Sequence, residues 1–399
     1  MLGLYIHIPF CRKICSYCDF YKMVVSDELK SKFFDYLIKD FNLLDDGVSN
    51  VNTIYIGGGT PSSVKLELLE RLFIELKKRI NLEKIIEFTF EINPEDINIE
   101  LLKLLKKYHV NRLSIGVQTF NKKHLKLLNR MTDYDDLKTK VKLLKEIGFE
   151  NYSFDLIYAL PEQTVEELSD DLKLVCSLEP KHISTYSLIL EDHTILKKLY
   201  DKKKWEIIDE EIDEKMYFQI IDFLNDFGYS QYETSNFSKE GYESKHNLIY
   251  WNNEQYYSIG PSSSDYLLNV RSKRTANLNN YFSSLDNNQV MLDEKDILSV
   301  GDMMEEEILL GLRKRKGLSK KSFFEKYNIE LLDAFPNIIK LINEGLLECD
   351  DDLVFIKKEY QYIANFIIVR ILEDAEKMMM GEKLDDLNEV NFVLSRTKK

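Results

Sequence analysis

Short apolar runs alternate with amphipathic stretches along the first 190 residues. In one amphipathic stretch Leu101, Leu104, Leu105 and Tyr108 follow the spacing i, i+3, i+4, i+7 of a buried helix face. The apolar runs predict strands at residues 4–10, 53–56, 86–92, 112–117, 152–157 and 182–188. The stretches between them predict helices near residues 27–44, 65–80, 97–108, 134–147 and 165–178. Strands that alternate with helices indicate βαβ units and a parallel sheet, so the fold class is α/β.

The pattern changes after residue 205, where a long helix is expected at 210–227. A stretch rich in Tyr, Ser and Asn follows at 229–265 and holds few helix formers. Further on, helices near 301–313, 318–326 and 336–345 precede a hairpin at 346–356, an order typical of a winged helix. We therefore expect four parts, namely a barrel at 1–205, a loop-rich extension at 206–290, a mainly helical winged-helix-like domain at 291–378 and a polar tail at 379–399.

Unusual residues stand at the ends of five predicted strands. Cysteines follow the first strand, and a run of three glycines that begins at Gly57 follows the second. The third strand ends at Glu91, the fourth at Gln118, and the fifth contains Asp155. Because chemistry in α/β barrels gathers on the loops at the carboxyl ends of the strands, these residues are expected to share one site.

Composition narrows the function classes. The net charge of −14 over 399 residues argues against nucleic acid as a partner. The sequence contains no run of 18 or more apolar residues, so we predict no membrane span, and peripheral membrane contact stays open. The amino terminus lacks the pattern of a secretory leader, and five cysteines are too few for a disulfide scaffold. A cytoplasmic location is therefore expected.

Three of the five cysteines crowd into eight residues, as Cys11, Cys15 and Cys18. This spacing suits three corners of an iron–sulfur cube and leaves one iron without a protein ligand, whereas such clusters normally have four cysteine ligands. A structural zinc site or a group of redox thiols is the alternative. Zinc sites usually have four protein ligands in paired knuckles, and no second pair follows here. Cys176 and Cys349 are interpreted as ordinary cysteines.

The cysteine spacing resembles the signature of the radical S-adenosylmethionine (SAM) superfamily. The resemblance implies a partial (β/α)6 barrel and a [4Fe–4S] cluster whose free iron is chelated by SAM. Successive glycines let backbone N–H groups approach a ligand, and an arginine can pair with a carboxylate through two hydrogen bonds. By resemblance, the SAM contacts are Tyr5, Tyr17, Gly58, Gly59, Thr60, Glu91, Gln118, Arg130 and Asp155. For His7, just before the cysteines, a role near the cluster and packing beneath it both stay open.

A second motif lies in the loop-rich region, where His246 and Asn247 are followed by Tyr250 and Trp251. A neutral imidazole can bind haem iron, and aromatic rings can pack against a porphyrin. A histidine beside Tyr and Trp is more often a core residue. The string H-N-x-x-Y-W, however, resembles the hallmark of HemW-like heme chaperones, which implies that these four residues handle haem.

The resemblance extends from Tyr5 to about residue 375 and covers two related groups. The anaerobic coproporphyrinogen III dehydrogenases carry a further cysteine two residues beyond the third, where this chain has Phe20. They also have a longer segment before their cysteines. We therefore prefer the hypothesis of a heme chaperone to that of a dehydrogenase. Such a protein would bind SAM, receive haem from a donor, and deliver it to acceptor haem proteins such as respiratory ones. Oxygen-independent coproporphyrinogen III oxidation is the alternative, and the residues predict SAM binding without settling SAM cleavage.

Overall fold

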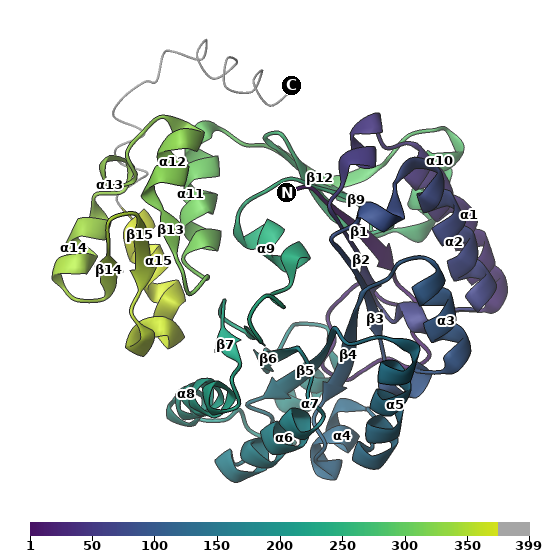
Figure 1. Cartoon of the computed structure of the whole chain (residues 1–399), viewed down its shortest axis with the longest axis horizontal. Helices are drawn as coiled ribbons and strands as arrows, with labels where there is room; N and C mark the ends of the chain where they lie inside the picture. The colour runs from purple at the N-terminus through teal and green to yellow at the C-terminus, as the bar shows by residue number, and fades with distance from the viewer. Residues whose placement is uncertain (374–399) are drawn as a thin grey trace. The chain divides into compact units, whose positions relative to one another are not determined.

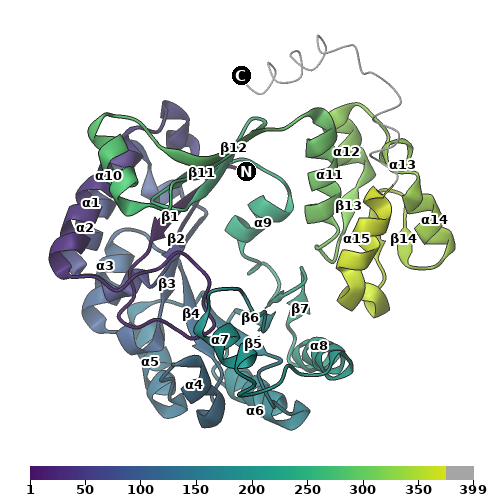
Figure 2. The ribbon, with the colours of Figure 1, turned by 180° about the vertical axis from the view of Figure 1, so that it is seen from behind.

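Six parallel strands follow one another through helical crossovers, in the computed structural model that describes residues 1–373. The strands are β1 Gly3–Ile8, β2 Thr53–Gly58, β3 Glu87–Ile92, β4 Arg112–Gln118, β5 Tyr152–Tyr158 and β6 His182–Ser187. The helices between them are α1 Asp27–Asn42, α2 Leu66–Arg79, α3 Ile99–Lys107, α4 Lys122–Leu128, α5 Tyr134–Ile147 and α6 Val165–Ser177. Figures 1 and 2 show these helices along the outer side of the curved sheet. The predicted α/β alternation is confirmed.

The sheet stays open instead of closing into a barrel. Its strand order is β12-β11-β10-β9-β1-β2-β3-β4-β5-β6-β8-β7. On one side β9 pairs parallel with β1, and on the other β8 pairs antiparallel with β6. The added strands are β7 Ser230–Gln231, β8 Asn236–Ser238, β9 Tyr256–Ile259, β10 Ser264–Leu267, β11 Val270–Arg274 and β12 Leu292–Ile297. The partial barrel that was predicted is therefore confirmed.

Local sequence explains where several helices begin and end. At the start of α1 the Ser26 hydroxyl accepts a hydrogen bond from the backbone N–H of Leu29. A capping box formed by Thr164 and Glu167 starts α6. Gly148 ends α5 in the left-handed conformation, with φ of 90°, which glycine adopts without steric cost.

Among the elements of residues 1–205, sequence patterns missed two short helices and placed one strand end too late. Neither α4 nor α7 Ile195–Asp201 was predicted, since seven residues give too few turns for a clear periodic signal. The first strand, expected to reach residue 10, stops at Ile8. It stops there because Pro9 has no N–H with which to continue a strand ladder.

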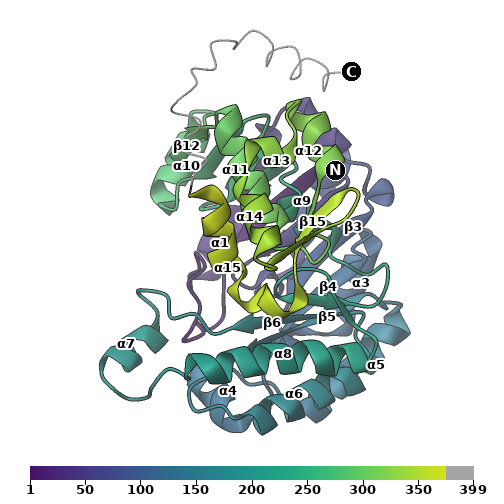
Figure 3. The same ribbon diagram turned by 90° about the vertical axis from the view of Figure 1, so that its left-hand side faces the viewer.

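The chain divides into two compact units. The first unit comprises residues 1–249, 256–265 and 272–295, and of the described residues the second comprises 250–255, 266–271 and 296–373. The first unit also contains α8 Glu210–Asp226, which packs against α6 as Figure 3 shows, and α10 Leu278–Asp286. Helix α9, Lys245–Trp251, spans the boundary between the units.

A buried ion pair ties the accessory strands to α1 within the first unit. The Arg274 guanidinium Nε lies 3.0 Å from one carboxylate oxygen of Asp40, and both side chains are buried. The same carboxylate accepts hydrogen bonds from the backbone N–H of Gly260 at 2.8 Å and from the Tyr281 hydroxyl at 2.9 Å. The pair is therefore hydrogen-bonded on several sides, as a buried charge requires.

The second unit has the helix and hairpin order expected of a winged helix. Its helices are α11 Val300–Gly311, α12 Lys320–Tyr327, α13 Leu331–Ala334, α14 Asn337–Asn343 and α15 Ala364–Leu372. Strands β13 Leu318–Ser319, β14 Leu347–Cys349 and β15 Leu353–Ile356 form a three-stranded sheet with β15 in the middle. Its core is apolar, with Ile308, Phe335 and Ile367 fully buried. The polar tail expected at 379–399 lies outside the described residues.

Candidate functional site

The three clustered cysteines lie on one loop between β1 and α1. Hydrogen bonds close the base of this loop, from the Cys11 N–H to the Met23 carbonyl at 3.0 Å and from the Met23 N–H to the Pro9 carbonyl at 2.7 Å. On its outer side, the Asn129 side-chain amide donates to the Ile14 carbonyl at 2.7 Å. The loop is therefore held by the protein at its base and at its tip.

All three thiols line one cavity of about 480 Å³ at the carboxyl ends of the strands. Burial raises the pKa of the Cys11 thiol to about 11 and also raises the pKa of Cys18. The Thr60 hydroxyl lies 3.6 Å from the Cys11 Sγ, and the Arg130 guanidinium lies 3.8 Å from the Cys15 Sγ. Both groups are donors, so they would stabilise thiolates formed on metal binding.

The donor set fits an iron–sulfur cube better than a single ion. Among residues 1–373 no group of three or more His, Cys, Asp or Glu side chains is close enough to hold one metal ion. A cube places each cysteine on a different iron, so its three sulfur ligands stand further apart than the ligands of one zinc. Three thiols that face a common cavity, with no fourth cysteine among its lining residues, match that arrangement.

His7 holds the returning end of the cysteine loop. Its Nε2 lies 2.9 Å from the Tyr21 carbonyl oxygen, and its Nδ1 lies 2.9 Å from the Tyr5 hydroxyl. A carbonyl can only accept, so Nε2 carries the proton and Tyr5 donates to Nδ1. Burial lowers the pKa of His7 to about 4, which keeps the ring neutral. A Cβ atom on Gly58 would lie 2.6 Å from the His7 ring, so the imidazole packs directly against the glycine run.

The glycine run passes close to the cysteine loop. The Gly59 N–H donates to the Ile8 carbonyl at 2.9 Å, and the Thr60 N–H donates to the Phe10 carbonyl at 2.8 Å. A Cβ atom on Gly59 would lie 2.7 Å from the Pro9 carbonyl carbon, a backbone atom that cannot move aside alone. Only glycine fits here, because the Pro9 backbone approaches so closely. That the run also admits a ligand stays a prediction.

Two carboxylates face the same cavity. Glu91 at the end of β3 accepts hydrogen bonds from the Tyr55 hydroxyl at 2.7 Å and from the Gly58 N–H at 3.1 Å. Burial raises the pKa of Glu91 to about 7, and the charge of Asp155 adds to this effect. Burial also raises the pKa of Asp155, against the hydrogen bond that it accepts from Ser114 at 3.1 Å. When ionised, the two carboxylates would attract a positively charged group of a ligand, such as an amine or a sulfonium.

Gln118 and Arg130 line the wall of the cavity beside the cysteine loop. Gln118 has φ of 70°, and the register of β4 shifts between Gly116 and Gln118, so a bulge turns this side chain. Arg130 donates to the Asn93 side chain at 2.9 Å and to the Gly116 carbonyl. Its Nε is buried and has no hydrogen-bond partner among residues 1–373, and the guanidinium as a whole lines the cavity, where a ligand carboxylate could pair with it.

Most expected SAM contacts therefore line one cavity, and Tyr5 does not. Tyr17, Gly58, Gly59, Thr60, Glu91, Gln118, Arg130 and Asp155 all line it, whereas the Tyr5 hydroxyl is used by His7. The sequence pattern missed Asn93, Ser114 and Ser184, which also line the cavity. Asn93 follows Glu91 by two residues, and alternate residues along an extended chain face the same side. Ser114 and Ser184 lie beside Glu91 and Asp155 on the neighbouring strands β4 and β6, which only the strand register shows.

The second motif is divided by the fold. The Asn247 side chain lines the cavity, whereas the His246 imidazole is fully buried inside the partial barrel. Its Nδ1 lies 2.8 Å from the Thr53 hydroxyl, and its ring lies 5.3 Å from the Tyr55 ring. Burial lowers the pKa of His246 to about 3, so the ring is neutral. In the second unit, Trp251 and Tyr250 complete the motif.

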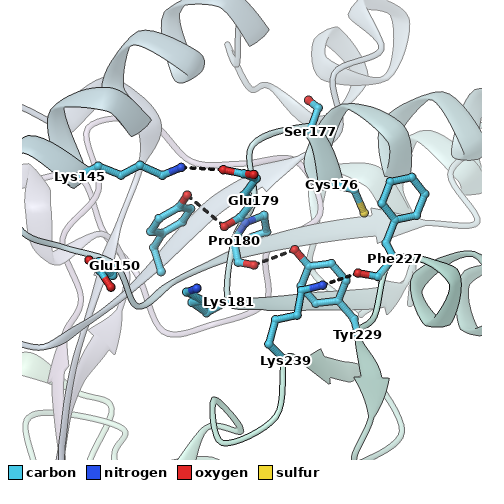
Figure 4. Close-up of a pocket in the computed structure, with 11 residues that line it drawn as sticks. Lys145, Glu150, Cys176, Ser177, Glu179, Pro180, Lys181, Phe227, Tyr229 and Lys239 are labelled. Atoms are coloured by element: carbon cyan, nitrogen blue, oxygen red, sulfur yellow. Dashed lines mark hydrogen bonds and ion pairs between the residues drawn. The ribbon is translucent and has the colours of Figure 1, made fainter.

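A larger cavity of about 770 Å³ lies at the opposite ends of β5 and β6 (Figure 4). Several of its polar groups already have partners within the protein. Lys145 pairs with Glu179 at 2.9 Å, and the Tyr229 hydroxyl donates to the Pro180 carbonyl at 2.7 Å. Burial raises the pKa of the Cys176 thiol to about 12, which keeps it neutral and unreactive. The cysteine-lined cavity is therefore the better candidate site.

Comparisons with known proteins agree with this geometry. The model of the radical SAM superfamily matches residues 5–175, and that of the HemN C-terminal domain matches residues 298–359. The chain is 38% identical to heme chaperone HemW of Lactococcus lactis over 93% of this chain and 97% of that protein. It is 36% identical to heme chaperone HemW of Bacillus subtilis over 92% and 97%.

Among solved structures, coproporphyrinogen III oxidase (HemN) of Escherichia coli superposes with a TM-score of 0.78 at 23% identity. That likeness covers 93% of this chain and 89% of that one, and it shows that the two share a fold. The resemblance drawn from the cysteine spacing and from the H-N-x-x-Y-W string is confirmed by the matches to named relatives. The chain belongs to the HemW family of radical SAM proteins.

Proposed function

We propose that this protein is a heme chaperone, which binds haem as cargo and delivers it to acceptor haem proteins. The observation that carries the proposal is the 36–38% identity, along nearly the whole chain, to relatives named heme chaperone HemW. The site supports it, since Asn247 of the H-N-x-x-Y-W motif lines the cysteine-lined cavity and the His246 ring packs against Tyr55, another lining residue. No helix within residues 1–373 is long and apolar enough to cross a membrane.

In this proposal Cys11, Cys15 and Cys18 hold a [4Fe–4S] cluster, which supplies an open iron for SAM. The glycine run lies against the cysteine loop, with the Gly59 N–H bonded to the Ile8 carbonyl, and it leaves space for the ligand because its residues carry no side chains. Arg130 lines the cavity, where its guanidinium can pair with the SAM carboxylate. Glu91 lies where it can accept from the amine or the ribose hydroxyls, and Gly58 and Tyr55 orient it.

Haem ligation by His246 would require the imidazole to change its contacts. Its Nδ1 is engaged by Thr53 and the ring is fully buried. The Glu87 carboxylate also accepts hydrogen bonds from the backbone N–H groups of His246 at 3.0 Å and Lys245 at 2.9 Å, which fixes the start of α9. Binding of haem iron at this histidine therefore implies that α9 moves away from β2.

Anaerobic haem titration tests the proposal. The cluster-loaded protein is expected to bind haem with a shifted Soret band, and His246→Ala should lose that shift if the imidazole binds the iron. His182→Ala is the matched control, since His182 is another buried imidazole of the partial barrel, 2.8 Å from the Tyr232 hydroxyl. Equal haem affinity in all three proteins would remove His246 from the site. Absence of haem binding by the wild type would refute the chaperone function.

Coproporphyrinogen III oxidation is the alternative to be excluded by assay. Phe20 occupies the position of the additional cysteine, and its side chain is 71% exposed at the mouth of the cavity. We expect the cluster-loaded protein with SAM and a reductant to release no CO₂ from coproporphyrinogen III. Stoichiometric decarboxylation would establish the enzyme instead of the chaperone.

A further inference from the structure

A buried arginine that the SAM site does not use lies at the start of β4. Arg112 lines the cysteine-lined cavity, although only 2% of its surface is exposed. The hydrogen bonds described for its guanidinium go to hydroxyl groups, from Nη1 to Thr89 at 3.5 Å and from Nη2 to Ser153 at 3.3 Å. An arginine keeps its charge in proteins, and a buried charge with hydroxyl partners in place of a carboxylate is costly. We therefore asked which group of the site this charge acts on.

A chain of hydroxyl groups leads from Arg112 to Asp155, one of the predicted SAM contacts. The Ser153 Oγ lies 3.1 Å from the Ser114 Oγ, and the Ser114 Oγ lies 3.1 Å and 3.3 Å from the two carboxylate oxygens of Asp155. The strand register explains this path. Ser114 and Ser153 are directly paired between β4 and β5, and alternate residues of a strand face the same side, so Arg112 and Asp155 share that side with them.

The two ends of this path fix the direction of its hydrogen bonds. A guanidinium can only donate and an ionised carboxylate can only accept, so Ser114 donates to Asp155 and accepts from Ser153. A competing acceptor for the Ser153 hydroxyl, the Leu113 carbonyl, lies further away at 3.4 Å. Hydrogen bonds aligned in this way polarise one another. The positive charge of Arg112 therefore stabilises negative charge on Asp155.

Asp155 also faces other polar groups. Burial raises its pKa, whereas the hydrogen bond from Ser184, the charge of Arg112 and the hydrogen bond from Ser114 lower it. The other charged or titratable groups that face it are Arg130 after α4, Glu91 on β3, Tyr55 on β2 and Tyr186 on β6. Arg130 is expected to pair with the SAM carboxylate. Arg112 is then the cation that remains directed at Asp155 when the ligand is bound.

We propose that Arg112 is a positioning residue, which acts through the two serines to orient the Asp155 carboxylate and keep it charged for SAM. The proposal rests on the SAM site described under the proposed function, and not on haem delivery. A charged carboxylate accepts stronger hydrogen bonds from ribose hydroxyls than a neutral one and attracts the sulfonium. A purely structural arginine is the alternative, since the charge of Glu87 on β3 also faces Arg112.

SAM affinity of the cluster-loaded protein, measured anaerobically by calorimetry, tests the path. Ser153→Ala interrupts the path and leaves the charge of Arg112 in place. Thr89→Val is the matched control, because Thr89 carries the other buried hydroxyl that accepts from Arg112 and lies off the path. We expect Ser153→Ala to weaken SAM binding about tenfold, as for one lost hydrogen bond toward a charged group, and Thr89→Val to change it less than about twofold. Equal weakening in both variants, or none in Ser153→Ala, would overturn the proposal.

The pH profile of SAM affinity tests the charge. Arg112→Met should let Asp155 bind its proton more readily, so affinity is lost at a higher pH than in the wild type. The midpoint should move upward by roughly one pH unit, the lower end of the effect of a nearby opposite charge. Arg112→Lys keeps the charge and should restore the wild-type midpoint. Arg112 also lowers the pKa of Glu91, so the comparison is repeated with Asp155→Asn in both proteins. There Arg112→Met should lose most of its effect, and an undiminished effect would overturn the proposal.

Urea unfolding and the iron content of each variant separate damage to the fold from loss of affinity. A lower unfolding midpoint in Arg112→Met with the wild-type pH profile of SAM binding would show a structural role and overturn the proposal. If Arg112→Met weakens binding and Ser153→Ala does not, the arginine acts on the ligand directly and the path is wrong.

The same measurements distinguish this proposal from the proposed function. Absence of SAM binding by the wild type would refute the SAM site and this proposal with it. SAM binding that neither Ser153→Ala nor Arg112→Met alters would overturn this proposal alone. Wild-type SAM binding without any haem binding would leave it intact and refute the chaperone function instead.

Discussion

His7→Phe should release one end of the cysteine loop while a ring still packs against Gly58. The variant removes the hydrogen bonds that His7 makes to the Tyr21 carbonyl and the Tyr5 hydroxyl, both at 2.9 Å. A buried polar group left without its partner costs about 1–3 kcal/mol, so local closure of the loop should weaken by about 2 kcal/mol. That change raises the population of the open loop about 30-fold.

The assay is the rate at which a chelator removes iron from the reconstituted protein. If the loop opens and closes faster than the chelator acts, iron loss follows the open population and should be about 30-fold faster in His7→Phe. Tyr5→Phe is the control, since it keeps the bond from Nε2 to Tyr21 and should accelerate loss only several-fold. Iron loss at the wild-type rate in His7→Phe would show that the base of the loop, closed at Met23, holds it unaided.

Three other changes have expected outcomes. Arg274→Met leaves the Asp40 carboxylate buried without its counter-charge, so the free energy of unfolding in urea should fall by about 3–5 kcal/mol, and an unchanged midpoint would contradict this. Gly59→Ala forces a Cβ to within 2.7 Å of the Pro9 backbone and should weaken SAM binding, measured by calorimetry, at least tenfold. An unchanged affinity would show that the loop can shift and would contradict this reasoning. Glu91, whose pKa is raised to about 7, is an anion only above that pH, so SAM affinity should rise between pH 6 and pH 8. Glu91→Gln should abolish this pH dependence, and a persistent dependence would assign it to another group.

The six parallel strands β1–β6 could be predicted because most of their residues are buried and clear breaks separate them, as β3 and β5 illustrate. The accessory strands β7–β12 could not, since they are short or carry exposed polar residues, as in β12. Site residues at the ends of the parallel strands could also be predicted, because parallel strands bring their carboxyl ends to one edge. The direction in which each of these side chains points could not be predicted. Tyr5 and His246 are expected to contact ligands, and in this structure their side chains are hydrogen-bonded to His7 and Thr53, which the sequence does not indicate. Such partners are distant in sequence or depend on the register of neighbouring strands, which composition and spacing do not encode.

The same limit explains the unforeseen role of α4. Its seven residues carry no periodic signal, but the helix ends at Asn129 in the left-handed conformation, with φ of 59°. That turn directs the next residue, Arg130, toward Cys15. The arginine could be identified from the sequence. The turn that directs its side chain toward Cys15 depends on local backbone geometry and could not be predicted.

The sulfur donors come from a single stretch of eight residues, whereas the groups expected to bind SAM come from four different strand ends. Removal of the metal should therefore leave the sheet folded, and the apoprotein should be reconstituted by adding iron and sulfide. A distortion of the sheet would have the opposite signature, with metal retained and cosubstrate lost. Loss of the metal would also remove the iron that SAM is expected to chelate, whereas a distorted sheet would leave the metal in place. Separate measurements of iron content and SAM binding therefore distinguish the two kinds of damage.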